Sequence, residues 1–331
     1  MPKALHPDLV LHHETGDSAF SNNVSACEHY AGDEKKLRKA LALQREMRGV
    51  FDVTADLEDG AAAGREAETA LALAEMLSEP RPEAHHVGCR VHPVDHPAFT
   101  HDVRTVLHVA GSTLSYLTIP KIAGHAQLQE AVAYVDQQAE HAGVRTPPLQ
   151  LLIEDEAALH DAFALAAHPR VRFIAFGQMD FTSSHRGAIP AEAMKSPGQF
   201  DHPLMRRAKC EIAAACHAHG KVPTHNPTTD YASPTQAAAD AARAKNEFGF
   251  MRMWSIHPNQ ILQILGVFAP SAAQIEDASR ILLAAQAADW GPIADHGLLH
   301  DRASYRFFWT LLKQARQLDR PIPESAQRAF F

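Results

Sequence analysis

Two segments of the chain place carboxylates where an apolar run stops. "LLIEDEAALHDAF" (151–163) starts like a buried strand and turns acidic at Glu154, and "VRFIAFGQMD" (171–180), one helix later, ends in Asp180. Two carboxylates with room for waters and substrate oxygens suit Mg²⁺. The histidines lack the HxxxH or HExxH spacing that would indicate zinc. The pattern therefore predicts a Mg²⁺ site held by Glu154 and Asp180.

Basic side chains stand at the ends of two other predicted strands, Arg90 in "CRVH" and Lys121 in "IPK". A guanidinium binds a carboxylate or carbonyl oxygen in two-pronged fashion. Together with a metal cation it suits an enolate, the anion left when a C–C bond breaks beside a carbonyl. Lys121 is expected either to pair with a carboxylate such as Glu154 or to contact substrate, and a Schiff-base role would require a depressed pKa.

The other polar residues at these strand ends have structural alternatives. The second predicted strand ends in three carboxylates, Asp56, Glu58 and Asp59. We expect them to orient the two basic groups. Asp155 is expected to cap a helix N-terminus, and His257 in "SIHPNQ" to fix a turn through hydrogen bonds rather than act as a base. His29 is expected to be a surface histidine, with a general base as its alternative.

Alternating strands and helices must position these groups. The predicted strands lie in "NNVSACEHY", "GVFDVTADLED", "HVGCRVHP", "LSYLTIPK", "LQLLIED", "VRFIAFGQMD", "KVPTHN" and "FMRMWSIHP". Eight strands alternating with helices in 331 residues predict an α/β fold, a closed (β/α)8 TIM barrel with its active site at the C-terminal strand ends. We expect mostly apolar strand interiors.

We place the barrel at residues 20–268 and a helical C-terminal extension, a lid and oligomerisation element, at 269–331. Helices are expected near 271–288 and 302–317, and a long loop over 181–201. The apolar residues of "YRFFWTLLKQARQL" are expected to pack at a subunit interface.

Composition limits the class of protein. The formal net charge is −8 without a basic block, which argues against nucleic-acid binding. The first 20 residues lack the apolar run of a signal peptide, and no stretch is apolar enough to span a membrane. The four cysteines show no CxxC spacing, as is typical of reduced thiols. A cytoplasmic protein is expected.

Six short motifs in order resemble the citrate lyase beta subunit and malyl-CoA lyase family, of the superfamily of barrels that bind phosphoenolpyruvate or pyruvate. They are "ADLEDG", "CRVH", "IPK", "IEDEAAL", "FGQMD" and "GFMRMWSIHPNQI", each at a predicted strand end. The resemblance covers residues 26–305. It implies that Glu154 and Asp180 hold Mg²⁺ and that Arg90 contacts the oxygens of a keto acid or enolate.

The same resemblance implies further roles. Substrate-binding residues would be Arg90, Glu58, Gly177, Gln178, Met179 and His257, and catalytic residues Arg90, Lys121, Asp59 and Asp301. Asp301, in "HGLLHDRASY", is similar to an aspartate that a C-terminal lid supplies to a neighbouring subunit. The family is identified with trimers or hexamers that act on an acyl-CoA and a 2-keto acid such as glyoxylate, pyruvate or oxaloacetate.

Three functions remain open at this stage. The first is a Mg²⁺-dependent C–C lyase acting on a malyl-CoA-like or citramalyl-CoA-like thioester. The second is a divalent-metal aldolase of hydroxy-keto acids that does not use CoA. It is motivated by two departures from the family pattern: "NVSACEHYAG" stands where the family usually has Arg-Ser-x-Leu-Phe-x-Pro-Gly, and "THNP" replaces the Asp-Gly of the seventh strand. The third is a non-catalytic barrel that binds a keto acid or acyl-CoA. The pair Glu154 and Asp180 argues against the third, because a pure binder has less reason to keep two metal ligands.

Overall fold

The computed structural model describes residues 5–11, 24–61, 63–233 and 235–331. Their contacts divide them into a barrel unit, which ends at Phe268, and a helical unit, which joins the N-terminal residues to 269–331. Residues 20–23, where the barrel was expected to begin, lie outside the described residues, as does most of the stretch searched for a signal peptide.

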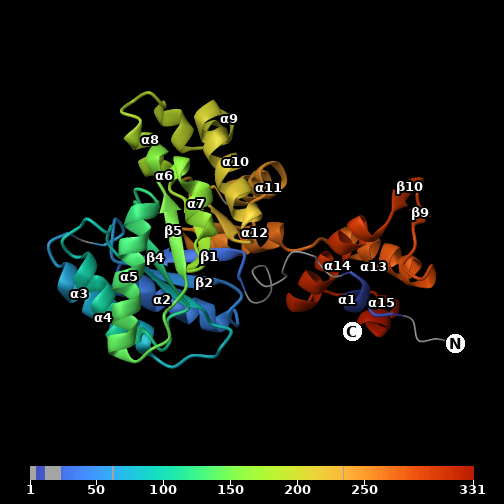
Figure 1. Ribbon diagram of the computed structural model, residues 1–331, viewed down its shortest axis with the longest axis horizontal. Helices are drawn as coiled ribbons and strands as arrows, with labels where there is room; N and C mark the ends of the chain where they lie inside the picture. The colour runs from blue at the N-terminus through green and yellow to red at the C-terminus, as the bar shows by residue number, and fades with distance from the viewer. Residues whose placement is uncertain (1–4, 12–23, 62, 234) are drawn as a thin grey trace. The chain divides into compact units, whose positions relative to one another are not determined.

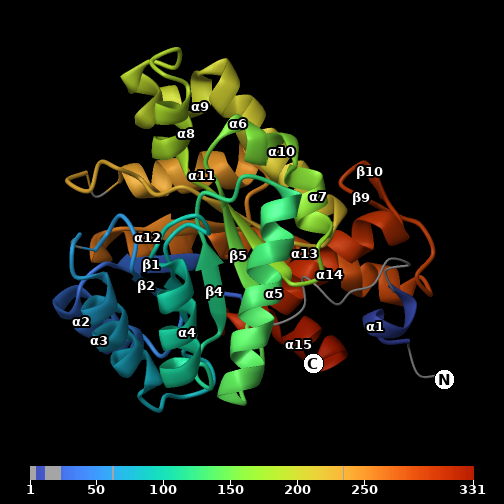
Figure 2. The same ribbon diagram turned by 60° about the vertical axis from the view of Figure 1, so that its left-hand side comes forward.

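Eight parallel strands close into a ring in chain order, with β1 hydrogen-bonded to β8. The predicted (β/α)8 barrel is confirmed (Figures 1 and 2). The strands are β1 (Cys27–Ala31), β2 (Asp52–Asp56), β3 (Val87–Arg90), β4 (Tyr116–Ile119), β5 (Leu149–Ile153), β6 (Val171–Phe176), β7 (Val222–His225) and β8 (Arg252–Ser255).

Helices connect successive strands and pack on the outside of the ring through apolar faces (Figures 1 and 2). They are α2 (Glu34–Glu46), α3 (Glu66–Ser78), α4 (Phe99–Ala110), α5 (His125–Ala142), α6 (Glu156–His160), α7 (Ala162–Ala167), α10 (Pro203–Ala218), α11 (Gln236–Phe248) and α12 (Pro258–Phe268). In α2, for example, Asp33 caps the N-terminus by accepting a hydrogen bond from the Lys36 N–H, and Leu37 and Ala40 are buried.

The strands are mostly apolar, as expected, but the space that they enclose is polar. Arg252 of β8 is fully buried, and its Nη2 lies 3.3 Å from Glu28 Oε2 and 2.8 Å from Asp52 Oδ2. Arg252 belongs to β8 and Asp52 to β2, two strands that β1 separates. Their side chains therefore meet inside the closed ring. The apolar residues that the sequence shows in these strands alternate with them and face the helices.

Hydrogen bonds continue this polar interior along the barrel. Arg252 Nη2 donates to the Tyr116 hydroxyl (3.3 Å), which lies 2.7 Å from Thr54 Oγ1, and Thr54 donates to Glu28 Oε1 (2.6 Å). Gln150 Nε2 in turn donates to the same Glu28 oxygen (3.0 Å). The buried charges therefore have partners on β1, β2, β4, β5 and β8, which fixes their positions.

Strand β6 is shorter than expected, and the loop predicted at 181–201 is largely helical. β6 ends at Phe176, because its neighbour β5 ends at Ile153 and offers no further partner. Asp180 therefore lies in the first turn of a helix rather than on a strand. The segment up to α10 contains α8 (Gln178–Ser184), the 3₁₀ helix η1 (Ala191–Met194) and α9 (Gly198–Asp201).

The helical unit has its own core. It contains α1 (Pro7–Val10), α13 (Ala272–Ala287), the hairpin β9 (Ile293–Asp295) and β10 (Leu298–His300), α14 (Arg302–Gln317) and α15 (Glu324–Phe330). Tyr305 and Trp309 of α14 are buried within this unit, and the Trp309 indole donates to Asp8 (2.7 Å). The apolar stripe expected at a subunit interface thus packs largely within the chain, although Phe307 is exposed.

Across the described ranges, no helix is both long and apolar enough to span a membrane.

Replacing Arg252 by Met should destabilise the barrel unit by about 3–5 kcal/mol, because Glu28 and Asp52 would remain buried without their cation. Urea unfolding followed by circular dichroism measures the change. The triple variant Arg252→Met, Glu28→Gln, Asp52→Asn is the control and should recover most of the lost stability. An unchanged unfolding midpoint in the single variant would contradict this account of the interior.

Candidate active site

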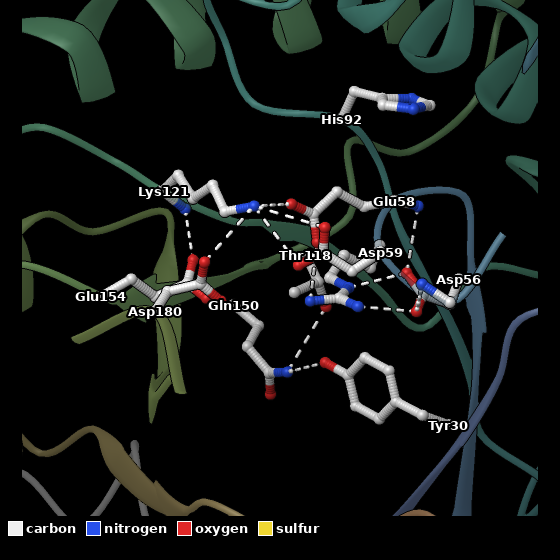
Figure 3. A network of polar contacts seen from close by, with 12 residues as sticks. Tyr30, Asp56, Glu58, Asp59, His92, Thr118, Lys121, Gln150, Glu154 and Asp180 are labelled. Carbon is white, nitrogen blue, oxygen red and sulfur yellow. Dashed lines mark hydrogen bonds and ion pairs between the residues drawn. The ribbon is translucent and has the colours of Figure 1, made fainter. Parts of the chain in front are cut away.

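Arg90, the last residue of β3, is held by Asp56 and Glu58 at the end of the neighbouring strand β2, and both carboxylates are labelled in Figure 3. Its Nε and Nη2 donate to the two oxygens of Asp56 at 2.7 and 2.6 Å, and its Nη1 lies 2.9 Å from Glu58 Oε2. The guanidinium stands over the Tyr30 ring at 5.3 Å. It is rigid and almost buried, yet N–H groups on Nη1 and Nη2 are left for a substrate oxygen.

Lys121 follows β4 and spans the gap between the β2 and β6 ends (Figure 3). Its Nζ lies 2.5 Å from Glu58, 3.3 Å from Asp59 and 3.7 Å from Asp180. Orientation of Arg90 and Lys121 by the β2 carboxylates is as the sequence predicted. Burial alone would lower the pKa of Lys121, but the hydrogen bond and the charges of these carboxylates raise it above its ordinary value. A Schiff-base role is therefore unsupported.

Glu154 contacts Lys121 differently from the ion pair considered above. Its Oε2 accepts a hydrogen bond from the backbone N–H of Lys121 at 2.7 Å. Glu154 is almost fully buried, and this burial raises the pKa of the carboxyl group to about 8, with Asp180 acting in the same direction and Arg90 against it. Gly177 packs on Glu154 so closely that a Cβ at position 177 would lie 2.3 Å from Glu154 Cγ.

The site carries more negative than positive charge. Its ionisable groups are the carboxylates Asp56, Glu58, Asp59, Glu154 and Asp180 and the cations Arg90 and Lys121. Lys121 contacts both proposed metal ligands, Glu154 through its backbone N–H and Asp180 through its ammonium group (Figure 3). Among the described residues, no three or more His, Cys, Asp or Glu side chains are grouped so that they could hold a metal ion by themselves. This donor set fits Mg²⁺, which takes one or two carboxylates and completes its octahedron with waters and substrate oxygens.

Comparisons with known proteins agree with this geometry. The family model for HpcH/HpaI aldolase/citrate lyase matches residues 38–258, a range that contains every strand end described here except that of β1. The chain belongs to the HpcH/HpaI aldolase/citrate lyase family. The predicted resemblance is thereby confirmed.

Individual relatives cover between 80% and 99% of the chain. An L-malyl-CoA/beta-methylmalyl-CoA lyase of Cereibacter sphaeroides is 30% identical over 80% of this chain and 87% of its own. The crystal structure of a citrate lyase from Burkholderia xenovorans LB400 is 48% identical with a TM-score of 0.88, covering 99% of this chain and 100% of that one. CitE of Mycobacterium tuberculosis, in complex with magnesium, acetoacetate and coenzyme A, shares the fold at 20% identity and TM-score 0.69, over 88% and 98% of the chains.

The other residues predicted for the site differ in their surroundings. Gln178 is buried and its side chain donates to the Met194 carbonyl at 2.7 Å, so it anchors the insertion after β6, whereas Met179 is exposed. His257 accepts from the Asn259 N–H (3.3 Å), the turn-fixing contact expected of it. Asp301 belongs to the helical unit and caps α14 by accepting from the Ala303 N–H (2.9 Å).

The structural roles expected of Asp155 and His29 have different outcomes. Asp155 caps α6 by accepting from the Ala158 N–H at 2.7 Å, as predicted. His29 is not the expected surface histidine: it is 5% exposed, with Nδ1 2.7 Å from Ser255 Oγ. It faces the α-helical layer rather than the rim, because it alternates with the inward-facing Glu28. A general-base role is therefore unsupported.

The end of β7 is closed off. His225 and Asn226, the last two residues of the predicted strand "KVPTHN", are fully buried. Lys209 of α10 places its Nζ 2.6 Å from His225 Nε2 and 2.6 Å from Asn226 Oδ1. Burial lowers the pKa of Lys209 well below its ordinary value. These groups satisfy one another beneath the rim, so we assign them no contact with substrate.

Sequence reasoning missed two features near Arg90. Tyr30 lies under the guanidinium and accepts a hydrogen bond from Gln150 Nε2 at 3.2 Å. A glutamine inside the apolar run "LQLLIED" was the signal that could have indicated it. His92, two residues after Arg90, pairs through Nδ1 with the buried Asp102 at 2.6 Å. No spacing rule links these two, because the pair depends on how α4 packs.

His29 should make stability depend on pH. Burial, and next His257, lower the pKa of its imidazole from 6.5 to about 4. Between pH 6.5 and pH 4 the imidazole is protonated in the unfolded chain but not in the folded one. The free energy of unfolding therefore decreases as the pH drops from 6.5 toward 4, by up to about 3 kcal/mol. Urea midpoints measured from pH 7.5 to pH 4.5 should therefore fall less steeply for His29→Asn than for the parent. The exposed control His219→Asn should follow the parent, and equal slopes for all three would contradict the assignment.

Proposed function

We propose that this protein is a Mg²⁺-dependent C–C lyase that cleaves or forms a malyl-CoA-like or citramalyl-CoA-like 3-hydroxyacyl thioester. The products of cleavage are an acyl-CoA and a 2-keto acid, with glyoxylate, pyruvate and oxaloacetate as candidates. The observation that carries this proposal is that Glu154 and Asp180 meet at Lys121 (Figure 3). The backbone N–H of Lys121 donates to Glu154 at 2.7 Å and its Nζ lies 3.7 Å from Asp180, while the charge of Arg90 acts on Glu154. The activities named for the 30% identical malyl-CoA lyase and the 48% identical citrate lyase support it.

Glu154 and Asp180 are the residues that would hold Mg²⁺. When bound, the cation supplies a Lewis acid that withdraws charge from a keto-acid oxygen. Arg90 would donate its remaining N–H groups to the substrate carboxylate or the developing enolate oxygen. Because Asp56 and Glu58 already hold the guanidinium in place, little reorganisation is required when negative charge develops.

The remaining residues are assigned to positioning and to proton transfer. Cleavage breaks the bond between C2 and C3 of the thioester. The 3-hydroxyl group loses its proton as it becomes the carbonyl of the keto acid, and C2, the α-carbon of the acyl-CoA enolate, must gain one. Asp59 is the exposed carboxylate of the rim, paired only with Lys121 among the described residues, and is one candidate for this exchange. Asp301 is the other, carried by the helical unit to the site of a neighbouring subunit. Gly177, Gln178, Met179 and His257 are proposed to line the substrate space.

Partners and location follow from the same proposal. A subunit that receives an aspartate from its neighbour must act as an oligomer, and we propose a homotrimer or a hexamer built from trimers. The cytoplasm is the proposed location, since acyl-CoA is available there. Four free cysteines, three of them buried, agree with a reducing compartment.

A direct assay tests the reaction. The purified chain is mixed with glyoxylate, Mg²⁺ and acetyl-CoA or propionyl-CoA, and the thioester is followed by mass. We expect a 3-hydroxyacyl-CoA product that disappears when the metal is chelated. No turnover with any acyl-CoA would remove this reading. Release of pyruvate from hydroxy-keto acids would then support the CoA-independent aldolase, and ligand binding without turnover would support the non-catalytic barrel.

Substitutions at the rim test the assigned metal ligands. Glu154→Gln and Asp180→Asn should each lower kcat/KM by about 100-fold and weaken Mg²⁺ binding, because each removes a charge expected to bind the cation. Mg²⁺ titration of the activity separates the two effects. The matched control is Asp155→Asn, at the residue next to Glu154. Asparagine can still cap α6 as Asp155 does, so this variant should leave activity unchanged. Full activity of either rim variant would exclude that residue as a ligand.

A further inference from the structure

A cavity lies at the opposite end of the barrel from Glu154 and Asp180. It has a volume of about 380 Å³. Its walls are the N-terminal ends of β2, β4 and β6 and the loops that precede β3, β4 and β5. The groups assigned to catalysis in the barrel unit follow the C-terminal strand ends, so this cavity is separate from the proposed active site.

Basic side chains dominate the charged groups around this cavity. They are Arg81, Arg145, Arg172, His85 and His86. The carboxylates in the lining are Asp52 and Glu83. Asp52 is already engaged by Arg252 at 2.8 Å inside the barrel and lies 3.5 Å from His86, and Glu83 is exposed to solvent. The positive charge of the cavity is therefore only partly offset by its own walls.

Arg81 and Arg145 lack acidic partners in the part of the chain that the structure describes. No ion pair joins either guanidinium to a carboxylate there. Arg81 Nη2 donates to the Met76 carbonyl at 3.3 Å, while its Nη1 is buried and has no hydrogen-bond partner among the described residues. A half-buried guanidinium with an unused donor is costly without a counter-charge, because burial has removed part of its hydration.

The direction of the pKa shifts of Arg81 and Arg172 agrees with a shortage of negative charge around them. Burial lowers the pKa of Arg81, and the charge of Arg45 acts in the same direction, against Glu79. Burial also lowers the pKa of Arg172, and the charges of Arg252 and Arg145 add to the effect, against Asp52. An anion placed among these groups would relieve the crowding of positive charge.

We propose that this cavity binds a small multivalent oxyanion, held by Arg81, Arg145 and Arg172. The planar fork of a guanidinium matches the oxygen pairs of phosphate and carboxylate groups. The volume is within the range of small-molecule sites. Phosphate and a polycarboxylate present the same charged oxygens, and the experiment below separates them.

Calorimetric titration of the whole chain tests the site. Inorganic phosphate is used in one arm and citrate in the other, both in buffer without divalent metal. We expect saturable binding of at least one anion, with phosphate alone indicating a tetrahedral ligand and citrate alone a carboxylate ligand. Arg145→Ala should weaken that binding about tenfold, the effect of losing one charge-assisted hydrogen bond. Arg145 is exposed, so its replacement leaves the core intact.

Two further variants test whether the binding depends on the arginines of the cavity. Arg81→Lys keeps the charge but loses the fork, and should also weaken binding. Arg38→Ala, an exposed arginine of α2 outside the cavity, is the matched control and should bind as the parent does. A lack of saturation by either anion up to about 10 mM would overturn the proposed site. Equal affinities of the parent and Arg145→Ala would also overturn it, because the anion would then bind elsewhere.

Discussion

The crowding of carboxylates at one end of the barrel is the constraint on which the site depends. Asp56, Glu58 and Asp180 pair with Arg90 or Lys121, and Glu154 accepts from the Lys121 backbone N–H. Burial, with the charge of Asp180 acting in the same direction, raises the pKa of the Glu154 carboxyl group to about 8. Such a cluster requires cations to persist, and two basic side chains supply part of them. A divalent metal ion would supply the rest, which is why the same geometry both holds the site together and suits magnesium.

The polar interior extends this constraint down the barrel. Replacement of buried ion pairs by apolar residues often stabilises proteins, so Arg252, Glu28 and Asp52 are not explained by stability alone. Their hydrogen bonds reach Gln150, which fixes the hydroxyl group of Tyr30 beneath the Arg90 guanidinium. We interpret this chain of contacts as support that sets the orientation of Arg90 from below, while the β2 carboxylates set it from the side.

The sequence indicated the frame and the rim because both follow simple rules. Strand and helix periods alternate along the chain, and parallel strands in a barrel bring their C-terminal ends together, so Arg90, Lys121 and Glu154 could be placed at one rim from their positions alone. The contents of the interior could not be predicted, since an inward-facing Glu28 and an outward-facing His29 differ only by register. The β6 insertion was missed because its short helices are defined by tertiary contacts such as that of Gln178 with Met194.

Lys121 shows how the backbone itself contributes to the site. Its φ of 49° lies in the left-handed region, which costs a non-glycine residue about 1–2 kcal/mol. Two sets of contacts act on this conformation: the backbone N–H binds Glu154, and the side chain reaches Glu58, Asp59 and Asp180. One residue thus ties the carboxylates of β2 to those that follow β5 and β6. The strain is concentrated where it joins the two halves of the site, as expected of a residue kept for its position rather than for local stability.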